Sequence, residues 1–441
     1  MKKRLFRVLF VLLFLLFQLP TICLGIETKD TITFDEILKL AKTQSYDIQI
    51  ADFDVYIAKQ GVRTARSEYF PKINAMAGTE YTKNFNDILN STVSVIGDAF
   101  INPYTRFQSL MGITLSYNVF DFGVRKNKMD YAKEDILLKE LLEKEQFQEL
   151  ELTIIDTYSK LYILKKQIEI NEEILALARR NLEYKTRLFE AKEISKPDLN
   201  DQEVEVQKYE RRISELKALA QESLNWLNFY TKQEYQLDNI KIKEFKKTDF
   251  DPLEFNDYTK SLTWLIQEKE IKKKELALNV AKRTNLPKVN AYSRYYLYGS
   301  DHSSYNRTLD DFGPSNYSVG ATILVPLFDG FKNSAEIQTA NLELQQQLIK
   351  RDKAIAHFMT RLATMRSNLV YLDKQMETDT KLFNELDDKQ KSIKKLVDKR
   401  ISTPIELNDA QIKLYEQQIE LEKNHTTIIA ITKAIQALTT Y

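Results

Sequence analysis

Few residues in this chain have the types and spacing that chemistry requires. The three histidines, His302, His357 and His425, are far apart in the sequence. The chain contains no H-E-x-x-H zinc motif, no G-x-S-x-G nucleophile motif and no phosphate-binding loop motif. We therefore expect the histidines to lie at the surface or to take part in packing. We also expect no catalytic activity, no bound cofactor and no metal site.

Two acidic clusters each follow a proline directly or closely. The chain reads DLND over residues 198–201 and ELND over residues 406–409. A carboxylate at the start of a helix is stabilised by the positive end of the helix dipole. We therefore expect Asp198 and Glu406 at the N-terminal ends of two helices. This placement can by itself explain their type, so a second role needs support from the rest of the chain.

The composition excludes some classes of partner and favours long helices. Lys plus Arg number 64 and Asp plus Glu number 63, which leaves no basic surplus to neutralise a phosphate backbone. Nucleic acid is therefore not an expected partner. Only 10 Gly and 9 Pro occur in 441 residues, so turns should be few and secondary structure elements long.

The first 25 residues have the pattern of a secretory signal peptide. Basic residues at positions 2–4 precede an apolar run over residues 5–17, which is shorter than the roughly 20 residues that span a bilayer as a helix. Cleavage after Gly25 would remove Cys23, the only cysteine. The alternative is a lipoprotein in which Cys23 carries a lipid, although Ile22 stands where a small residue is expected.

The rest of the chain is a tandem duplication. PKINA at residues 71–75 returns as PKVNA at residues 287–291, and Gly112 with FD eight residues later returns as Gly320 with FD eight residues later. ISKP at residues 194–197 likewise returns as ISTP at residues 401–404. We therefore divide the mature chain into a first repeat over residues 26–230, a connecting segment over residues 231–251 and a second repeat over residues 252–441. Each repeat should read helix, strand, loop, strand, long helix, turn, long helix.

Apolar residues at intervals of seven predict coiled-coil hairpins in both repeats. Helices of this kind extend up to roughly 97 Å at about 1.5 Å per residue, which is too long for a compact domain. The hairpins should therefore form a rod or a tube. The apolar positions are Phe147, Ile154, Leu161, Ile168, Leu175, Leu182 and Phe189, then Leu199, Val206, Ile213, Ala220 and Leu227, and in the second repeat Leu348, Ile355, Leu362, Leu369, Met376 and Phe383, then Leu407, Leu414, Leu421, Ile428 and Ile435.

Residues 106–120 and 317–327 alternate between apolar and small polar side chains, which is typical of a strand between lipid and a watery lumen. Weaker alternation covers residues 69–81 and 286–299. Four strands cannot close a transmembrane barrel, whose smallest members have about eight, and open sheet edges are not tolerated in lipid. Several copies of the chain must then share one barrel. The polar loops at residues 82–105 and 300–316 would face the cell exterior.

The strands are also rich in tyrosine. An aromatic girdle at the membrane interface and a strand-rich soluble domain would both favour this residue. The tyrosines concerned are Tyr69, Tyr81, Tyr292, Tyr295, Tyr296 and Tyr298.

The signal peptide, the two repeats, the paired strands and the coiled hairpins together resemble the TolC family of outer-membrane efflux ducts. The resemblance covers nearly the whole mature chain. It implies a homotrimer with a shared 12-stranded barrel in outer-membrane lipid and a helical tunnel that extends into the periplasm. It further implies a passive exit duct of a tripartite efflux or type I secretion system, which conducts drugs or other solutes. The implied partners are a periplasmic adaptor protein and an inner-membrane efflux pump or ABC transporter.

The resemblance also assigns roles at the hairpin turns. It places acidic residues around the periplasmic entrance, where converging carboxylates would favour cations and have raised pKa values. These are Glu406 and Asp409 first, then Asp198 and Asp201. The residues that the resemblance implies for adaptor docking are Ile194, Ser195, Lys196, Pro197, Ile401, Ser402, Thr403 and Pro404. The chain departs from the family at Lys192 and Arg400, where glycine is common.

Two other protein classes compete with the duct. A periplasmic or surface coiled-coil protein with a structural role and no channel would share the heptads. An adaptor protein would also contain a helical hairpin, but its usual single hairpin between β domains does not match the duplication.

Overall fold

The computed structural model describes residues 31–83, 94–96, 99–101, 106–246, 250–252 and 257–440. The predicted signal peptide over residues 1–25, with Cys23, lies outside this part of the chain. Most of the predicted loop over residues 82–105 also lies outside it. Strands β3 (Ser94–Ile96) and β4 (Ala99–Ile101) form a small antiparallel pair within that loop.

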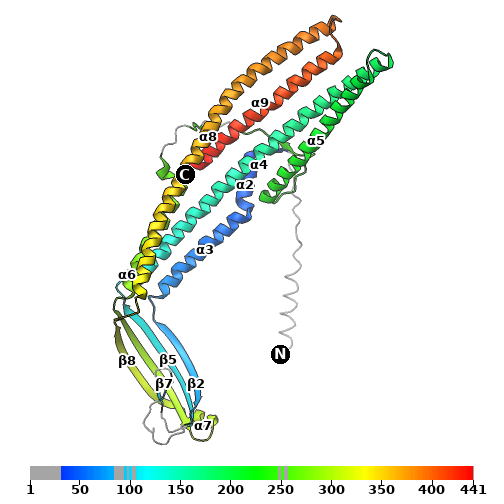
Figure 1. Ribbon diagram of the computed structural model, residues 1–441. Coiled ribbons are helices and arrows are strands. Elements are labelled where there is room, and N and C mark those ends of the chain that lie inside the picture. Colours follow the sequence, from blue (N-terminus) through cyan, green and yellow to red (C-terminus); the bar gives the residue numbers. More distant parts are fainter. Residues whose placement is uncertain are drawn as a thin grey trace, which may run out of the picture.

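Two long helical hairpins dominate the molecule, as the heptads predicted (Figure 1). The hairpins are α4 (Val124–Glu190) with α5 (Lys196–Thr231), and α8 (Lys332–Asp398) with α9 (Pro404–Thr439). The outgoing helices both have 67 residues and the returning helices both have 36, which confirms the duplication. At about 1.5 Å per residue, α4 and α8 are each roughly 100 Å long.

The heptad positions are buried in the middle of the hairpins and become more exposed toward some ends. Ile154 and Leu161 of α4 are fully buried, and Leu362 of α8 is 1% exposed. Phe189 near the tip of α4 is 37% exposed, and Leu348 near the start of α8 is 36% exposed. Packing of the apolar stripe therefore holds the central part of each hairpin together.

Shorter helices precede the strands of each repeat. The second repeat has α6 (Leu262–Thr284), whereas the single helix expected in the first repeat is two helices, α2 (Phe34–Gln44) and α3 (Tyr46–Ser67). Ser45 interrupts them with a ψ of 136°, which is extended backbone. The helices α3, α4, α6 and α8 lie side by side in the half of the molecule nearest the sheet (Figure 1).

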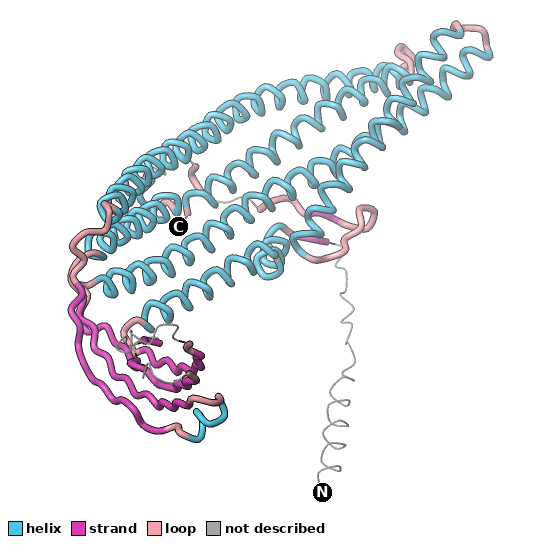
Figure 2. Tube along the Cα trace, turned by 60° about the horizontal axis from the view of Figure 1, so that its bottom comes forward, coloured by secondary structure: helices cyan, strands magenta, loops and turns pink. Residues whose placement is uncertain are grey.

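The four long strands form one antiparallel sheet, in the order β2, β5, β7, β8. Figure 2 shows them side by side as a curved sheet at the end of the helical body. The strands β2 and β8 are its edges, and neither pairs with another described strand on its outer side. The bounds are β2 (Lys72–Tyr81), β5 (Phe107–Phe120), β7 (Lys288–Asp301) and β8 (Gly313–Leu324).

The register confirms one apolar and one polar face. Ile113 is paired with Tyr295, which in turn is paired with Tyr317, so these side chains share the apolar face. Ile113 is 52% exposed and Tyr317 is 69% exposed, so the apolar face is uncovered there in the single chain. Thr114 is paired with Arg294, which is paired with Ser318, and these belong to the polar face.

The same register contradicts one girdle built from all the strand tyrosines. Tyr295 lies on the apolar face with Ile113, but Tyr296 is paired with Gly112 and points to the polar face. Tyr292 and Tyr298 share the face of Tyr296 because successive side chains of a strand alternate. The abundance of tyrosine alone could not reveal this difference, because it does not say on which face of the strand each tyrosine lies.

The predicted bounds of the last strand and loop were also wrong. β8 begins at Gly313 and ends at Leu324, whereas residues 317–327 were expected. Pro326 follows the end of the strand closely and has no N–H to donate to a ladder. The predicted loop over residues 300–316 contains a short helix, α7 (Tyr305–Asp310), which packs on β5 and β7.

The largest apolar core lies midway along the hairpins and involves the segment between the repeats. Strand β1 (Thr31–Ile32) pairs in parallel with β6 (Lys241–Ile242), which belongs to residues 231–251. The fully buried Tyr158 of α4 donates a hydrogen bond to the backbone oxygen of Lys243 at 2.6 Å. Burial raises the pKa of the Tyr158 phenol.

Within the described residues, no helix combines the length and the apolar character needed to cross a membrane.

The glycines that marked the duplication each accommodate a tyrosine of β7. A Cβ added at Gly112 would lie 2.1 Å from Cδ1 of Tyr296, and one added at Gly320 would lie 2.6 Å from the hydroxyl of Tyr292. The absence of a side chain therefore lets each ring lie flat across the neighbouring strand.

We expect Gly112→Val to destabilise the sheet by about 1–3 kcal/mol, because the tyrosine ring must leave its position. Gly78→Val is the matched control, since it also lies in a strand of this sheet and a Cβ there meets nothing within 4 Å. Denaturant unfolding of the detergent-solubilised protein measures both. Equal losses for the two variants would show that the ring contact does not matter.

Candidate functional site

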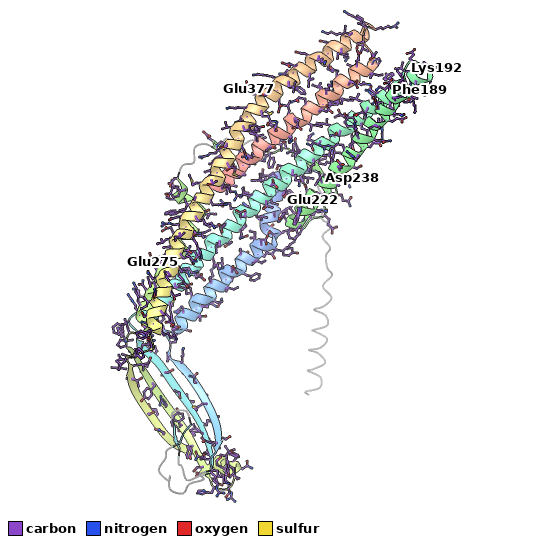
Figure 3. The ribbon with its side chains drawn as sticks, in the orientation of Figure 1. Phe189, Lys192, Glu222, Asp238, Glu275 and Glu377 are labelled. Atoms are coloured by element: carbon purple, nitrogen blue, oxygen red, sulfur yellow. The ribbon has the colours of Figure 1, made fainter. Side chains whose placement is uncertain are left out.

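The tips of both hairpins lie at the end of the molecule opposite the sheet (Figure 1). Figure 3 shows Phe189 and Lys192 at the tip of the first hairpin. The residues predicted for the entrance and for docking all belong to these turns or to the first two turns of the helix that follows. They therefore lie together at one end of the molecule.

Both turns begin with the same backbone motif. Lys192 has a φ of +59°, its N–H donates to the oxygen of Phe189 at 2.9 Å, and the next N–H donates to the oxygen of Leu188 at 2.8 Å. Arg400 has a φ of +61° with matching bonds to Val397 and from Ile401 to Leu396, both of 2.9 Å. These are Schellman motifs, which usually place glycine at the left-handed position. The departure at Lys192 and Arg400 therefore leaves the expected turn geometry in place.

We expect Lys192→Gly and Arg400→Gly each to stabilise the hairpin slightly. The left-handed conformation costs a residue with a Cβ roughly 1–2 kcal/mol, and the greater freedom of glycine in the unfolded chain offsets about 0.4–1 kcal/mol of the gain. Thermal unfolding should show a rise in midpoint for both variants. The control Lys192→Ala removes the same side chain but retains the Cβ, and a comparable rise there would rule out the backbone explanation.

The first acidic residue of each cluster lies in the first turn of the returning helix, and in α5 it completes a capping box. Ser195 is the N-cap of α5, and its N–H and hydroxyl donate to the carboxylate of Asp198 at 3.1 and 2.5 Å. These hydrogen bonds, chiefly the one from the Ser195 hydroxyl, lower the pKa of Asp198. Thr403 is the N-cap of α9, and the Ser402 hydroxyl donates to the carboxylate of Glu406. Asp198 therefore has a capping role, Glu406 is bonded to the turn before its helix, and both carboxylates remain at the surface.

The cap positions correct the alignment of the two turns. Ser195 and Thr403 are equivalent N-caps, so the ISKP and ISTP matches are out of step by one residue. Helix α9 starts at Pro404, whereas α5 starts at Lys196 and has Pro197 as its second residue. Matching letters suggested equivalent prolines, but the helix ends place them at different positions of the first turn.

Asp409 makes a contact between the two hairpins that sequence reasoning missed. Its carboxylate accepts a hydrogen bond of 2.8 Å from the side-chain N–H of Asn181 on α4, and the side-chain N–H of Asn408 donates to the Asn181 oxygen at 2.8 Å. Asn181 is fully buried. Asp409 is itself exposed, as is Asp201, its counterpart in the first repeat.

A signal for Asn181 does exist in the sequence. It stands seven residues after the fully buried Ile174, so it continues a second apolar stripe of α4 with an amide. A polar residue at a buried coiled-coil position typically fixes the register of the helices. The predicted heptad positions lie on the neighbouring stripe, which runs through Leu182. They therefore do not include Asn181.

A second contact ties the hairpins further from the tip. The hydroxyl of Tyr209 on α5 donates to the carboxylate of Glu416 on α9 at 3.3 Å. Burial and then the charge of Glu416 raise the pKa of Tyr209 to about 12. The phenol therefore stays protonated, and able to donate, at ordinary pH.

Among the described residues, no group of three or more His, Cys, Asp or Glu side chains is arranged to hold a metal ion. The histidines are separate from one another, and His425 lies 3.0 Å from the carboxylate of Glu244.

Solved structures of outer-membrane proteins share this fold. The outer membrane protein VceC of Vibrio cholerae is 13% identical, with a TM-score of 0.74 over 92% of this chain and 96% of that one. A membrane protein from Pseudomonas aeruginosa is 15% identical, with a TM-score of 0.75 over 92% and 93% of the two chains. The CmeC outer membrane channel of Campylobacter jejuni is 13% identical, with a TM-score of 0.73 over 91% of this chain and 85% of that one.

No curated protein matches the chain. The model of the outer membrane efflux protein family, in contrast, matches residues 37–231 and 267–439. The match covers most of both repeats, and the resemblance stated from the sequence is confirmed. The chain therefore belongs to the outer membrane efflux protein family.

Proposed function

We propose that the protein is the outer-membrane exit duct of a tripartite efflux or type I secretion system and passively conducts drugs or other solutes from the periplasm to the exterior. One observation carries the proposal: an antiparallel sheet with an uncovered apolar face continues directly into helices of 67 residues. The apolar face suits outer-membrane lipid, and the helices are long enough to extend far into the periplasm. A coiled-coil protein with a purely structural role has no need of such a sheet.

We infer that the working form is a homotrimer. No described strand pairs with the outer edge of β2 or β8, and pairing β8 of one copy with β2 of the next would remove these open edges, as lipid requires. The helices flanking these edges support the same contact, because Phe53 and Ile57 of α3 are 66% exposed and Ile349 of α8 is 70% exposed. Three copies of a four-stranded sheet would close the 12-stranded barrel that the resemblance implies.

The tips then form the periplasmic entrance and the docking surface. Three copies of Glu406, Asp409, Asp198 and Asp201 at one end would give the entrance a negative potential, which favours cations. The exposed turns around Ser195 and Thr403 would receive a periplasmic adaptor protein. An inner-membrane efflux pump or ABC transporter would supply the energy through that adaptor, since the duct itself has no expected nucleotide site.

Paired lysine substitutions in β2 test the membrane sheet and the channel together. Ala75 shares the apolar face with Ile113, and its neighbour Asn74 shares the polar face with Thr114. Ala75→Lys should reduce insertion severely, because a basic residue facing lipid at the bilayer midplane costs about 2–4 kcal/mol. Asn74→Lys should insert and show unitary conductance in a planar bilayer.

Three outcomes separate the alternatives. Conductance for wild type and Asn74→Lys, with little insertion of Ala75→Lys, supports the duct. Equal insertion of both variants contradicts the assignment of the faces. Absence of unitary conductance in repeated wild-type preparations favours the coiled-coil protein without a channel.

A further inference from the structure

A pocket of about 330 Å³ lies where the sheet meets the long helices. It is formed by the end of α3, the start of β2, the end of β5, the start of α4 and the start of β7. Four cationic side chains and two carboxylates line it: Lys72, Arg125, Lys128, Lys288, Glu68 and Asp121. The site already described lies at the opposite end of the molecule.

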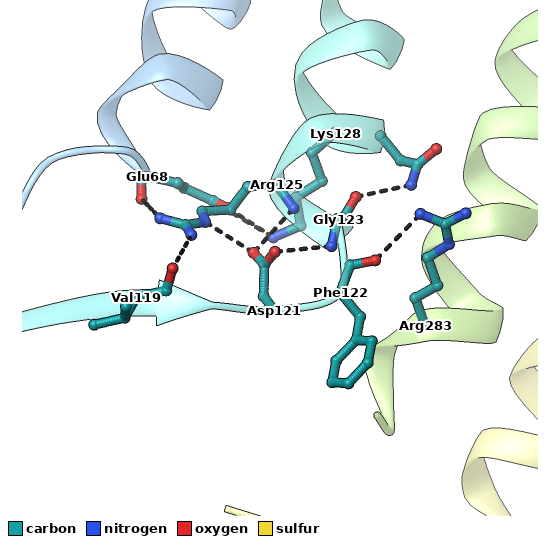
Figure 4. A network of polar contacts seen from close by, with 9 residues as sticks. Glu68, Val119, Asp121, Phe122, Gly123, Arg125, Lys128 and Arg283 are labelled. Atoms are coloured by element: carbon teal, nitrogen blue, oxygen red, sulfur yellow. Dashed lines mark hydrogen bonds and ion pairs between the residues drawn. The ribbon is translucent and has the colours of Figure 1, made fainter. Parts of the chain in front are cut away.

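Two of the cations are neutralised within the pocket wall (Figure 4). The Arg125 Nε donates to Asp121 at 2.9 Å, and the same carboxylate accepts from the N–H of Gly123 at 3.1 Å. The Lys128 Nζ lies 3.0 Å from the carboxylate of Glu68. Both carboxylates of the pocket are thus committed to Arg125 and Lys128.

Lys72 and Lys288 remain as a positive surplus. Neither forms an ion pair with a described residue, although both line the same pocket. Ser116, Asn118 and Asn290 add polar groups to the lining. The side-chain oxygen of Asn118 is buried and has no hydrogen-bond partner among the described residues.

We propose that this pocket binds a phosphate group. Two ammonium groups without carboxylate partners match the charge of a phosphate, and amide and hydroxyl groups beside them complete its hydrogen bonds. A free phosphate or phosphate monoester that retains a proton, or a hydroxyl of a glycerol headgroup beside a lipid phosphate, also donates to the unpartnered oxygen of Asn118, which a fully deprotonated anion such as sulfate does not. The phosphate comes from a free or cargo-borne phosphate ester or from a lipid headgroup.

The strand residues of the pocket share the polar face of the sheet, because Lys72 is paired with Ser116 and Asn118 with Asn290, so a lipid headgroup reaches the pocket only around the end of the sheet that joins the helices. Exposed aromatic side chains lie at the end of the sheet that joins the helices, called here the foot of the sheet. Phe70 is 57% exposed, Phe120 is 49% exposed and Phe122 is 42% exposed. Aromatic and basic residues gather where a membrane meets water. The lipid source rests on the proposed placement of the sheet in the outer membrane, whereas binding of free phosphate does not.

Lysine acetylation of the full-length protein, read by peptide mass spectrometry, tests the proposal without any need for conductance. In detergent, inorganic phosphate is compared with chloride at equal ionic strength. Vesicles of phosphatidylcholine alone and of phosphatidylcholine containing phosphatidylglycerol, both without inorganic phosphate, are each compared with the chloride sample in phosphate-free detergent. Lys282 is the matched control, because it is an exposed lysine near the foot of the sheet that does not line the pocket.

We expect acetylation of Lys72 and Lys288 to slow severalfold with Lys282 unchanged. Protection by inorganic phosphate identifies the free anion as a ligand, and protection by either kind of phospholipid vesicle but not by inorganic phosphate identifies the lipid headgroup. Absence of protection in both arms overturns the proposal, as does equal protection of Lys282. A failed channel with protected lysines would leave the pocket assigned and reject only the duct.

A variant tests whether the two lysines hold one ligand. Lys288→Met should abolish most of the protection of Lys72, whereas Lys282→Met should leave it intact. Both substitutions are outside the helical cores, and thermal unfolding checks that each variant folds. Undiminished protection of Lys72 in Lys288→Met would contradict a shared phosphate site.

Discussion

The double variant Glu406→Gln with Asp409→Asn should lose much of its preference for cations while keeping the structure of the tip. The new amide at position 406 can still accept from Ser402, and the new amide at position 409 can still accept from Asn181, so the hydrogen bonds of the wild type have replacements. Only the charge at the hairpin tip changes. At low ionic strength we expect the cation-to-anion permeability ratio to fall by a factor on the order of 10, because focused fields concentrate counter-ions by at least that much.

The reversal potential across a salt gradient in a planar bilayer measures this ratio. The difference between wild type and variant should shrink at high salt, since screening shortens the reach of the carboxylates. Glu406→Ala with Asp409→Ala should show the same loss of selectivity together with altered gating, because it also removes the bond to Asn181. An unchanged reversal potential in the charge-only variant would leave these carboxylates with a capping and packing role alone.

Asn181→Leu should leave the channel open for a larger fraction of time and lower its stability by about 1–3 kcal/mol. Asn181 is fully buried and is hydrogen-bonded to two residues of α9, so its loss leaves Asn408 and Asp409 without those bonds. The contact between α4 and α9 near the tip is weakened while the apolar stripe of each hairpin is retained. Single-channel recording gives the open probability, and thermal unfolding gives the stability.

Asn171→Leu is the matched control for this prediction. Asn171 is also a buried amide of α4, 6% exposed, but its side chain donates to the backbone oxygen of Gln167 in its own helix at 2.7 Å. Its replacement removes a buried amide without breaking a bond between the hairpins. A similar rise in open probability for both variants would show that general loosening of α4, and not the contact with α9, controls opening.

Elements with a strong repeating pattern could be predicted from the sequence. The heptads through Ile154 and Leu362 predicted the hairpins, and alternation around Ile113 predicted the apolar face of the sheet. The pairing of β1 with β6 could not be predicted, because strands of two residues have no period. Tyr158, whose hydroxyl bonds the chain next to these strands, gives no sign of that role in its local sequence.

The placement of the candidate residues at the hairpin turns could be predicted from the sequence, but their contacts could not. The placement of Asp198 and Glu406 at the helix starts was foreseeable, since their bonds are to residues three or four positions away. The bond between Asn181 and Asp409 joins residues 228 positions apart, and no local pattern connects them. The pocket between Lys72 and Lys288 likewise exists only because β2 and β7 belong to one sheet.

The unequal placement of the prolines has a consequence for symmetry. Each chain presents two tips with the same backbone turn, so a closed ring of copies offers twice as many tips as it has subunits. Since Pro197 is the second residue of its helix and Pro404 the first, neighbouring tips are quasi-equivalent and not identical. A ring of partner proteins that contacts only the Schellman turn, which both tips share, can bind every tip in the same way. A partner that contacts the first helical turn must instead alternate between two binding modes around the ring.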